Sequence, residues 1–260
     1  TRVDLAEPLA PGRSATFAVA WRFLIPVHGA DRMRRDGAPY ELAPWYPRVS
    51  VYDDVRGWNT EPYLGQGEFY LEYGDYNVAV TVPAGYIVAA TGALQNPAEV
   101  LTPTEIARLA QAAKSETPVR IVTADELKSG AARPRRTGTM TWRFAARNVR
   151  DAVWAASPDY KWDASSWKGI LAQAYYRPSA NDTWGQGEAA DQARMSIQEY
   201  SERWFQYPWP QISAVEGTIS GMEYPMLAME THSQDKYDLY NVVTHEIGHD
   251  WFPMIVGSNE

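Results

Sequence analysis

The sequence predicts a β-rich amino-terminal domain over residues 1–178, followed by the beginning of an α+β domain over residues 179–260. Three observations lead to this fold class. Short runs of branched and aromatic residues, separated by Gly, Pro and Asp turns, fill the first part. After Pro178 the apolar residues take a helical spacing, and a helix with two histidines is expected near residue 247. We expect the strands of the first part to form an all-β layer rather than an α/β sheet.

The amino-terminal part contains several predicted strands. Apolar and aromatic residues with at least partial alternation indicate strands at residues 14–27, 45–52, 69–73, 76–83 and 87–92. Residues 31–37 are charged and end in Gly, which predicts a loop. Two further strands are expected at residues 140–146 and 169–176.

A helical insertion is predicted between these strands, near residues 102–136. Residues 104–114 are rich in helix formers, and a hydroxyl residue at their start is a candidate amino-terminal cap. Residues 123–128 indicate one further turn.

The second part begins with a predicted helix over residues 188–205, in which apolar residues recur at intervals of three and four. Pro208 and Pro210 end it, and we place the domain boundary near residues 177–182. Residues 212–227 follow, where Pro225 fits an edge strand because Pro cannot donate to a ladder. A free strand edge is a place where an extended peptide can add.

The chemistry centres on His245, Glu246 and His249 in the pattern H-E-x-x-H. Residues four apart share one face of a helix, so both imidazoles can reach a single ion. This pattern is typical of a catalytic Zn²⁺ site in which the glutamate acts as general base. The alternative is a helix that merely carries two histidines, but three fixed uncommon positions in a chain with four histidines argue against it.

The residues after the motif narrow the class of zinc site. A metzincin needs Gly and His at the positions of Phe252 and Ile255, so that class is excluded. Asp250 follows His249 directly and faces away from the ion, and Glu260 reaches back only if the helix ends early. The third ligand is therefore not identified from these residues.

The ends of the histidine-bearing helix can also be predicted. Asp235 or Asp238 suits its amino-terminal cap. Pro253 removes a hydrogen bond to the carbonyl of His249 and should end or kink the helix.

Residues 245–252, together with residues 221–225 (Gly-Met-Glu-Tyr-Pro), resemble the gluzincin aminopeptidases of the aminopeptidase N and leukotriene-hydrolase group. The resemblance implies a saddle-like β domain followed by a thermolysin-like zinc metallopeptidase domain. It further implies a third ligand, a glutamate on the next helix, and a catalytic tyrosine further on. Neither position exists in this chain, so we expect the amino-terminal portion of a larger enzyme that is catalytically poor when isolated.

The resemblance implies a role for each residue of the histidine motif. His245 and His249 would hold Zn²⁺, and Glu246 would deprotonate a water. The rest of the catalytic domain would then be a required partner, since it supplies the missing glutamate and tyrosine.

The resemblance also implies a substrate-binding motif. Glu223, with Gly221 and Met222 beside it, would grip the free α-ammonium of a peptide substrate. Glu216 and Glu230 are less favoured alternatives to Glu223, and a solvated strand carboxylate is the plainest alternative role.

Relatives often add a Gln or Glu from the β domain at the amino end of the substrate. Glu41, Gln66 and Glu68 are all candidates here, and Pro44 stands where relatives carry Gln. His232 is expected to be a surface residue.

Other functions remain open at this point. A zinc endopeptidase would give Glu223 no ammonium to bind, and an epoxide hydrolase on the same scaffold would need a long apolar tunnel. A non-catalytic interaction module is the third alternative.

Composition limits the remaining possibilities. The 260 residues, 45% hydrophobic and 13% aromatic, suffice to bury a sizeable core. The net charge of −8 argues against a nucleic-acid binder, which needs basic surface. No run is long and apolar enough to cross a bilayer. The absence of cysteine, the aromatic-rich composition and the start at Thr lead us to expect an exported protein, periplasmic or secreted.

Overall fold

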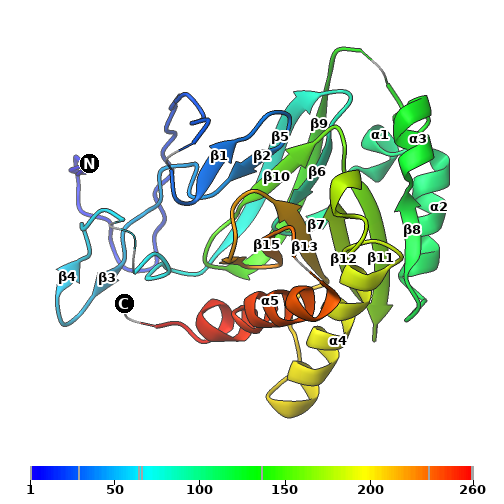
Figure 1. Cartoon of the computed structure of the whole chain (residues 1–260). Helices are drawn as coiled ribbons and strands as arrows, with labels where there is room; N and C mark the ends of the chain where they lie inside the picture. The colour runs from blue at the N-terminus through cyan, green and yellow to red at the C-terminus, as the bar shows by residue number, and fades with distance from the viewer. Residues whose placement is uncertain are drawn as a thin grey trace.

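The computed structural model describes residues 2–28, 30–63, 65, 67–135, 137–233 and 235–258. Within these ranges the protein is mostly sheet with few helices (Figure 1). No described helix is both long enough and apolar enough to span a membrane.

Most strands of the amino-terminal part form sheets with antiparallel neighbours. A four-stranded sheet has the order β1 (Met33–Arg35), β2 (Tyr40–Leu42), β10 (Trp154–Ser157), β6 (Ile87–Ala90). A three-stranded sheet has the order β5 (Gly74–Pro83), β9 (Thr139–Val149), β7 (Ala93–Leu94). A small hairpin joins β3 (Tyr52–Asp53) and β4 (Gly57–Trp58).

A mixed six-stranded sheet positions the candidate site. Its order is β14 (Met222–Tyr224), β15 (Leu227–Thr231), β13 (Gln211–Gly217), β12 (Ile170–Tyr176), β11 (Lys161–Trp167), β8 (Val119–Val122). β13 runs parallel to β12 and to β15, and the other pairs are antiparallel. Backbone pairing therefore crosses residue 178, and the division of the chain into domains there stays a prediction.

The helices fall into two groups. α1 (Pro97–Val100) lies just before the predicted insertion. The insertion itself contains α2 (Pro103–Ala112) and α3 (Ala124–Ser129), with the strand β8 between them, and both helices begin with capping boxes, at Thr102 and Thr123. After the short turn η1 (Pro178–Ala180) come α4 (Glu188–Arg203), α5 (Lys236–Gly248) and the irregular turn η2 (Asp250–Ile255). The two long helices pack on each other and on the six-stranded sheet (Figure 1).

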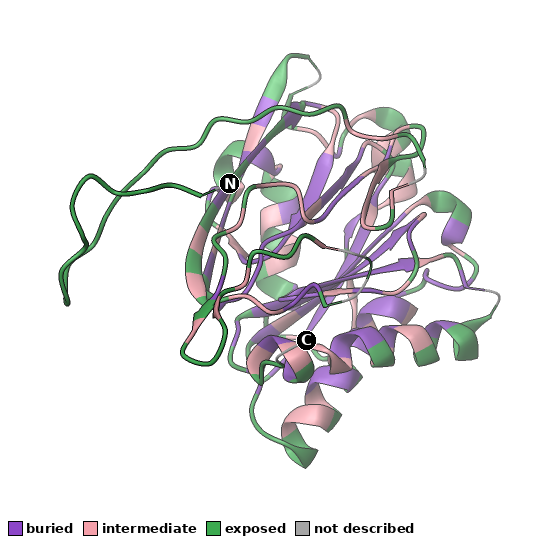
Figure 2. Ribbon diagram, turned by 90° about the vertical axis from the view of Figure 1, so that its left-hand side faces the viewer, coloured by how far each residue is buried: buried purple, intermediate pink, exposed green. Residues whose placement is uncertain are grey.

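The core lies between the sheets and under these helices. Trp184, Ile197, Ile212 and Trp251 are fully buried there. Figure 2 shows the strands largely buried, whereas the amino-terminal segment is exposed along most of its length. The central strands β11, β12 and β13 are buried on both faces, whereas β5 and β9 alternate between buried and exposed residues.

The predicted strand at residues 14–27 is wrong, because the described backbone there is irregular. Phe17, Trp21 and Phe23 are 67%, 46% and 44% exposed. Alternation shows which side chains share a face, but a strand forms only where a second strand accepts its hydrogen bonds. No described strand pairs with this segment.

Three further segments also differ from the prediction. The predicted loop at residues 31–37 contains β1, which pairs with β2 despite its charged residues. Of residues 45–52 only Tyr52 lies in a strand, because Trp45 and Tyr46 direct their polar atoms to residues 151–152 instead. Residues 69–73 form no strand, since the Arg150 guanidinium takes two of their carbonyls.

Candidate active site

The histidine motif lies on the last turn of α5, where the sequence predicts it. Asp235 caps the helix by accepting hydrogen bonds from the backbone N–H groups of Tyr237 and Asp238, both at 2.8 Å. The α-helical part ends at Gly248, and Phe252, just before Pro253, has non-helical backbone angles. Both expectations for this helix, its cap and its end before Pro253, are confirmed.

The two imidazoles point their Nε2 atoms at each other. These nitrogens are 3.2 Å apart, and the rings stand edge to face with centroids 4.8 Å apart. His249 Nδ1 lies 2.9 Å from the carbonyl oxygen of Phe252. A carbonyl can only accept, so Nδ1 carries a hydrogen, and the neutral imidazole then has its lone pair on Nε2. This arrangement is the one in which an imidazole can bind a metal through Nε2.

The geometry of this pair fits zinc. Two ligand nitrogens at about 2.05 Å from a tetrahedral Zn²⁺ are about 3.3 Å apart, close to the separation of the His245 and His249 nitrogens. No cluster of three or more His, Cys, Asp or Glu able to hold a metal occurs within the described ranges. Asp250 is committed elsewhere, since it accepts from the Met226 backbone N–H at 3.1 Å and lies 3.1 Å from the Tyr207 hydroxyl. Glu260 lies outside the described residues.

Glu246 lies between the helix and the sheet, only 8% exposed. Its burial, and secondarily the negative charge of Glu223, raise the pKa of its carboxyl to about 7. Its Oε2 has no hydrogen-bond partner among the described residues. Gly221 lies directly opposite, with a left-handed φ of +66°, and a Cβ there would be 3.3 Å from Glu246 Oε1. Gly221 thus leaves the space in front of the carboxylate open.

Glu223 lies on β14, at one end of the six-stranded sheet, where the sequence predicts an edge strand. It is half-buried and pairs in register with Ala228 of β15. Met222 next to it is fully buried, and its side chain belongs to the core. The negative charge of Glu223 contributes to the raised pKa of Glu246, so the two carboxylates are near enough for their charges to interact.

The amino-terminal part contributes two charged groups to this region. Arg32 Nη1 donates to the Gly221 carbonyl oxygen at 2.8 Å, and Arg32 Nε donates to Glu68 Oε2 at 3.1 Å. Burial raises the pKa of Glu68, Arg32 lowers it, and Glu223 raises it. Of the β-domain candidates, Glu68 is thus the one whose charge interacts with Glu223.

The other β-domain candidates have different surroundings. Glu41 accepts from the Thr218 backbone N–H at 2.7 Å and from its hydroxyl at 2.6 Å, so it holds the loop before β14. Pro44 lies after β2 and has no charge to offer. Gln66 lies outside the described residues.

The two alternatives to Glu223, Glu216 and Glu230, differ in whether their carboxylates have partners. Glu216 forms a bidentate ion pair with Arg177. Glu230 is fully buried, and neither oxygen has a hydrogen-bond partner among the described residues. Burial, followed by the charges of Glu246 and Glu223, raises its pKa well above the ordinary value. His232 is half-exposed and lies 3.7 Å from Asp182, as expected of a surface residue.

Sequence reasoning did not predict the contact of Arg32 with Gly221, nor that Glu230 is fully buried without a hydrogen-bond partner among the described residues. Arg32 stands in a segment predicted to be a loop, 189 residues from Gly221. The only signal for Glu230 is a glutamate within an apolar run, at a position of β15 that shares a face with Ala228.

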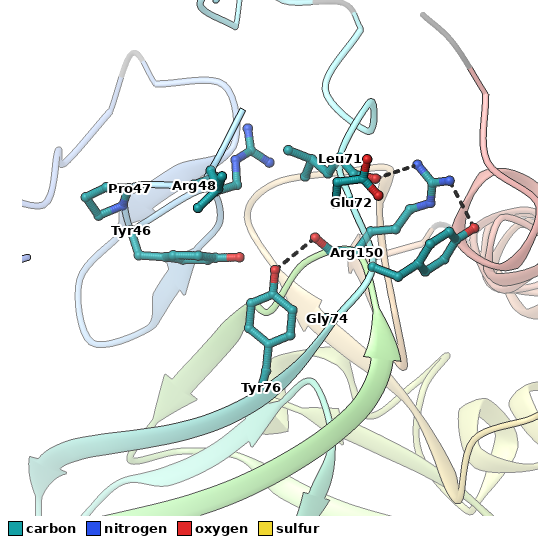
Figure 3. Close-up of a pocket in the computed structure, with 10 residues that line it drawn as sticks. Tyr46, Pro47, Arg48, Leu71, Glu72, Gly74, Tyr76 and Arg150 are labelled. Carbon is teal, nitrogen blue, oxygen red and sulfur yellow. Dashed lines mark hydrogen bonds between the residues drawn. The ribbon is translucent and has the colours of Figure 1, made fainter. Parts of the chain in front are cut away.

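One cavity of about 290 Å³ lies apart from these residues (Figure 3). Tyr46, Arg48, Tyr73 and Arg150 are among the residues that line it. Arg48 is paired with Asp151 at 2.7 Å, and Arg150 donates to backbone carbonyls and to the Tyr73 hydroxyl. None of the predicted site residues lines this cavity.

No protein-family model matches the chain, and a search of curated proteins finds no match. Solved structures do align with part of the chain. An M1 zinc metallopeptidase from Deinococcus radiodurans aligns with 18% identity and a TM-score of 0.46, covering 71% of this chain and 36% of that one. A mutant of the Deinococcus radiodurans enzyme aligns with 17% identity and a TM-score of 0.47, covering 71% and 36%. A mutant of a two-domain M1 zinc metallopeptidase bound to L-arginine aligns with 17% identity and a TM-score of 0.46. The alignment covers 71% of this chain and 35% of that one.

The chain thus spans about a third of the length of these solved proteins.

Proposed function

We propose that this chain carries part of the active site of a zinc-dependent aminopeptidase, which removes amino-terminal residues from peptides. The observation that supports it most directly is the pair of Nε2 atoms 3.2 Å apart, one with its tautomer set by the Phe252 carbonyl. The same helical turn carries Glu246, and the neighbouring edge strand carries Glu223. The third ligand and the catalytic tyrosine would come from the rest of the catalytic domain.

His245 and His249 are the residues that would hold the metal. When bound, zinc supplies a Lewis acid and lowers the pKa of a coordinated water to about 7. Glu246, with its own pKa near 7, suits the task of taking a proton at neutral pH and passing it to the leaving amine. Its unpartnered Oε2 leaves an acceptor for that proton.

The exopeptidase role depends on Glu223 and the free edge of β14. A peptide that adds along this edge would bring its α-ammonium to a carboxylate beside Glu246. The ammonium would fix the substrate's amino end, so only the first peptide bond would reach the catalytic base. Glu68 adds a second carboxylate, which Arg32 contacts, and its burial favours a role in this charge network over a solvated one.

The metal site is tested by titrating Zn²⁺ into the 260-residue chain and measuring binding by isothermal titration calorimetry. We expect one weak site, because a two-histidine site lacks a third protein ligand. His245→Ala should abolish it, and His232→Ala, at a half-exposed histidine elsewhere, should leave it unchanged. Zinc uptake that survives His245→Ala would overturn the assignment.

The peptidase role is tested in a polypeptide that also supplies the third ligand. Glu246→Gln should retain zinc and lose at least about 100-fold in kcat, as expected for loss of a general base. Glu223→Gln should raise KM for a peptide amide with a free amino end and leave the rate on its acetylated counterpart unchanged. Faster hydrolysis of the acetylated peptide by the unaltered protein would point to an endopeptidase instead.

A further inference from the structure

A turn of residues 218–221 joins β13 to the edge strand β14. Its last residue, Gly221, lies opposite Glu246, and Glu223 follows two residues later. β14 is only three residues long and has a single neighbour in the sheet, β15. A strand this short makes few backbone hydrogen bonds, so the contacts of the preceding turn have a large share in fixing where Glu223 lies.

Side chains from β1 and β2 contact both ends of this turn. Arg34 and Glu41 are directly opposite in the strand register, so their side chains lie on the same face of the sheet. Arg34 Nη1 donates to the Thr218 carbonyl oxygen at 3.3 Å, and Glu41 accepts from the Thr218 backbone N–H at 2.7 Å and from its hydroxyl at 2.6 Å. Arg32, just before β1, donates from Nη1 to the Gly221 carbonyl oxygen at 2.8 Å. The turn is thus attached at its first and its last residue.

These contacts are shielded from water. Glu41 is 1% exposed, and the Arg32 side chain is 20% exposed. Glu68 accepts from Arg32 Nε at 3.1 Å and so helps to orient the guanidinium toward Gly221. A hydrogen bond in such surroundings is electrostatically stronger than in water, and losing one partner is costly. The position of the turn therefore depends on the side chains from the amino-terminal part.

A purely electrostatic role for Arg32 would have the opposite effect on substrate binding. Burial lowers the pKa of Arg32, but the charges of Glu68 and then Glu223 raise it above its ordinary value, so Arg32 and Glu223 attract each other. The positive charge of Arg32 repels an ammonium that binds to Glu223. If Arg32 acted on the substrate through its charge alone, its removal would strengthen binding.

We propose that Arg32, Arg34 and Glu41 are positioning residues, which hold the turn of residues 218–221 so that Glu223 meets the amino end of the substrate. This role rests on the proposed aminopeptidase function. The attraction between a carboxylate and an ammonium weakens as their separation grows, so displacement of β14 would lower substrate affinity. The amino-terminal part of the chain thereby takes part in recognising a free amino end.

Steady-state kinetics test this role in a polypeptide that also supplies the third zinc ligand. The substrate is the free-amino peptide amide that the unaltered protein cleaves best. Arg32→Met and Thr218→Val should each raise KM at least about fivefold, through misplacement of Glu223. The value of kcat should change less than about twofold, because none of the hydrogen bonds that Arg32 or Thr218 forms among the described residues reaches α5.

Arg133→Met is the matched control for Arg32→Met. Arg133 is also half-buried and also donates to backbone carbonyls, those of Gly85 at 2.6 Å and Pro158 at 2.8 Å, but it does not contact the turn. Its replacement should leave KM unchanged. Circular dichroism checks that each variant folds. A KM that rises equally in Arg133→Met, or that stays the same or falls in Arg32→Met, would overturn the proposal.

A double-mutant comparison shows whether Arg32 acts through Glu223. In a Glu223→Gln background, Arg32→Met should raise KM by no more than about twofold, because the group that it positions is already altered. An equal rise of KM in both backgrounds would mean that Arg32 affects the substrate by another route, and would contradict the positioning role.

Amide hydrogen exchange of the metal-free 260-residue chain, followed by mass spectrometry, needs neither zinc nor substrate. Arg32→Met and Thr218→Val should speed exchange at residues 219–224 at least about tenfold, and Arg133→Met should not. Unchanged exchange in the first two variants would overturn the proposal. Faster exchange in a protein that cleaves no peptide would instead show that the aminopeptidase function fails while the attachment of the turn stands.

Discussion

The Arg32 guanidinium joins the amino-terminal part of the chain to the loop that carries Gly221. Its Nη1 donates to the Gly221 carbonyl oxygen at 2.8 Å, and its Nε donates to Glu68 at 3.1 Å. The Glu68 side chain is 5% exposed and that of Arg32 is 20% exposed, so the pair is largely shielded from water. Removing one member of a shielded pair leaves the other charge without compensation.

We therefore predict that Arg32→Met lowers the free energy of unfolding by about 2 kcal/mol. Urea denaturation followed by circular dichroism measures the loss. In a Glu68→Gln background the same substitution should cost clearly less, because no buried charge is then left unpaired. Equal losses in the two backgrounds would show that the ion pair contributes nothing.

Gly217 and Glu41 form a second contact between the two parts of the chain. A Cβ added at Gly217 would lie 1.4 Å from Glu41 Oε1, so any larger residue must displace this carboxylate. Displacement breaks its hydrogen bonds to Thr218, at 2.7 and 2.6 Å. We predict that Gly217→Ala lowers the free energy of unfolding by about 2–3 kcal/mol.

Gly85→Ala is the matched control, since nothing lies within 4 Å of a Cβ at that position. Its effect should stay within about 0.5 kcal/mol. Urea denaturation of both variants makes the comparison, and similar losses for the two would mean that Glu41 moves aside freely.

The elements that sequence reasoning predicted correctly depend on local interactions. Helix α5 begins where Asp235 accepts from N–H groups two and three residues on, and α2 begins with a capping box. Strand β5 alternates clearly over its length. Residues 14–27 have a comparable apolar pattern but no strand beside them among the described residues. The sequence pattern therefore predicts which backbone conformation a segment prefers locally. It does not predict which strands pair with each other.

The same distinction applies to the candidate site. The spacing of His245, Glu246 and His249 places them on one helical turn, which local geometry alone predicts. The Arg32 contact with Gly221 spans 189 residues and depends on how the sheets pack, which no local pattern contains. The pKa shift of Glu246 likewise depends on burial and on Glu223 from another strand.

Asp250 makes stability depend on pH. It is 2% exposed, and its burial raises the pKa of its carboxyl from an ordinary 3.8 to about 8. The folded state therefore binds a proton that the unfolded state releases between about pH 4 and pH 8. This contribution is complete at low pH and is lost as the pH rises, by up to about 1.4 kcal/mol per pH unit.

The isosteric Asp250→Asn variant should lack this dependence. Its amide can accept from the Met226 N–H and donate to the Tyr207 hydroxyl, which in turn donates to the Gln211 carbonyl. We predict that the variant gains stability relative to the unaltered protein as the pH rises from 5 to 8. Urea denaturation at each pH gives the difference, and a constant difference across this range would contradict the shift.

The charge of Glu223 should affect the titration of Glu246. Burial and the Glu223 charge together raise the pKa of Glu246 to about 7, so removing that charge should lower the pKa. Carboxyl ¹³C NMR of the metal-free chain measures it directly, with Glu246→Gln to assign the resonance. We expect a midpoint near pH 7 in the unaltered chain and a lower one in Glu223→Gln.

The control for this titration is Glu202→Gln, at an exposed glutamate of α4 that does not act on the Glu246 pKa. It should leave the Glu246 midpoint unchanged. A midpoint near the ordinary value of 4.5 in the unaltered chain would mean that water reaches the carboxylate freely. Glu246 would then lack the raised pKa that suits it to act as a base at neutral pH. If the midpoint is raised but does not fall in Glu223→Gln, burial alone sets it, and Glu223 lies too far away to share a substrate with Glu246.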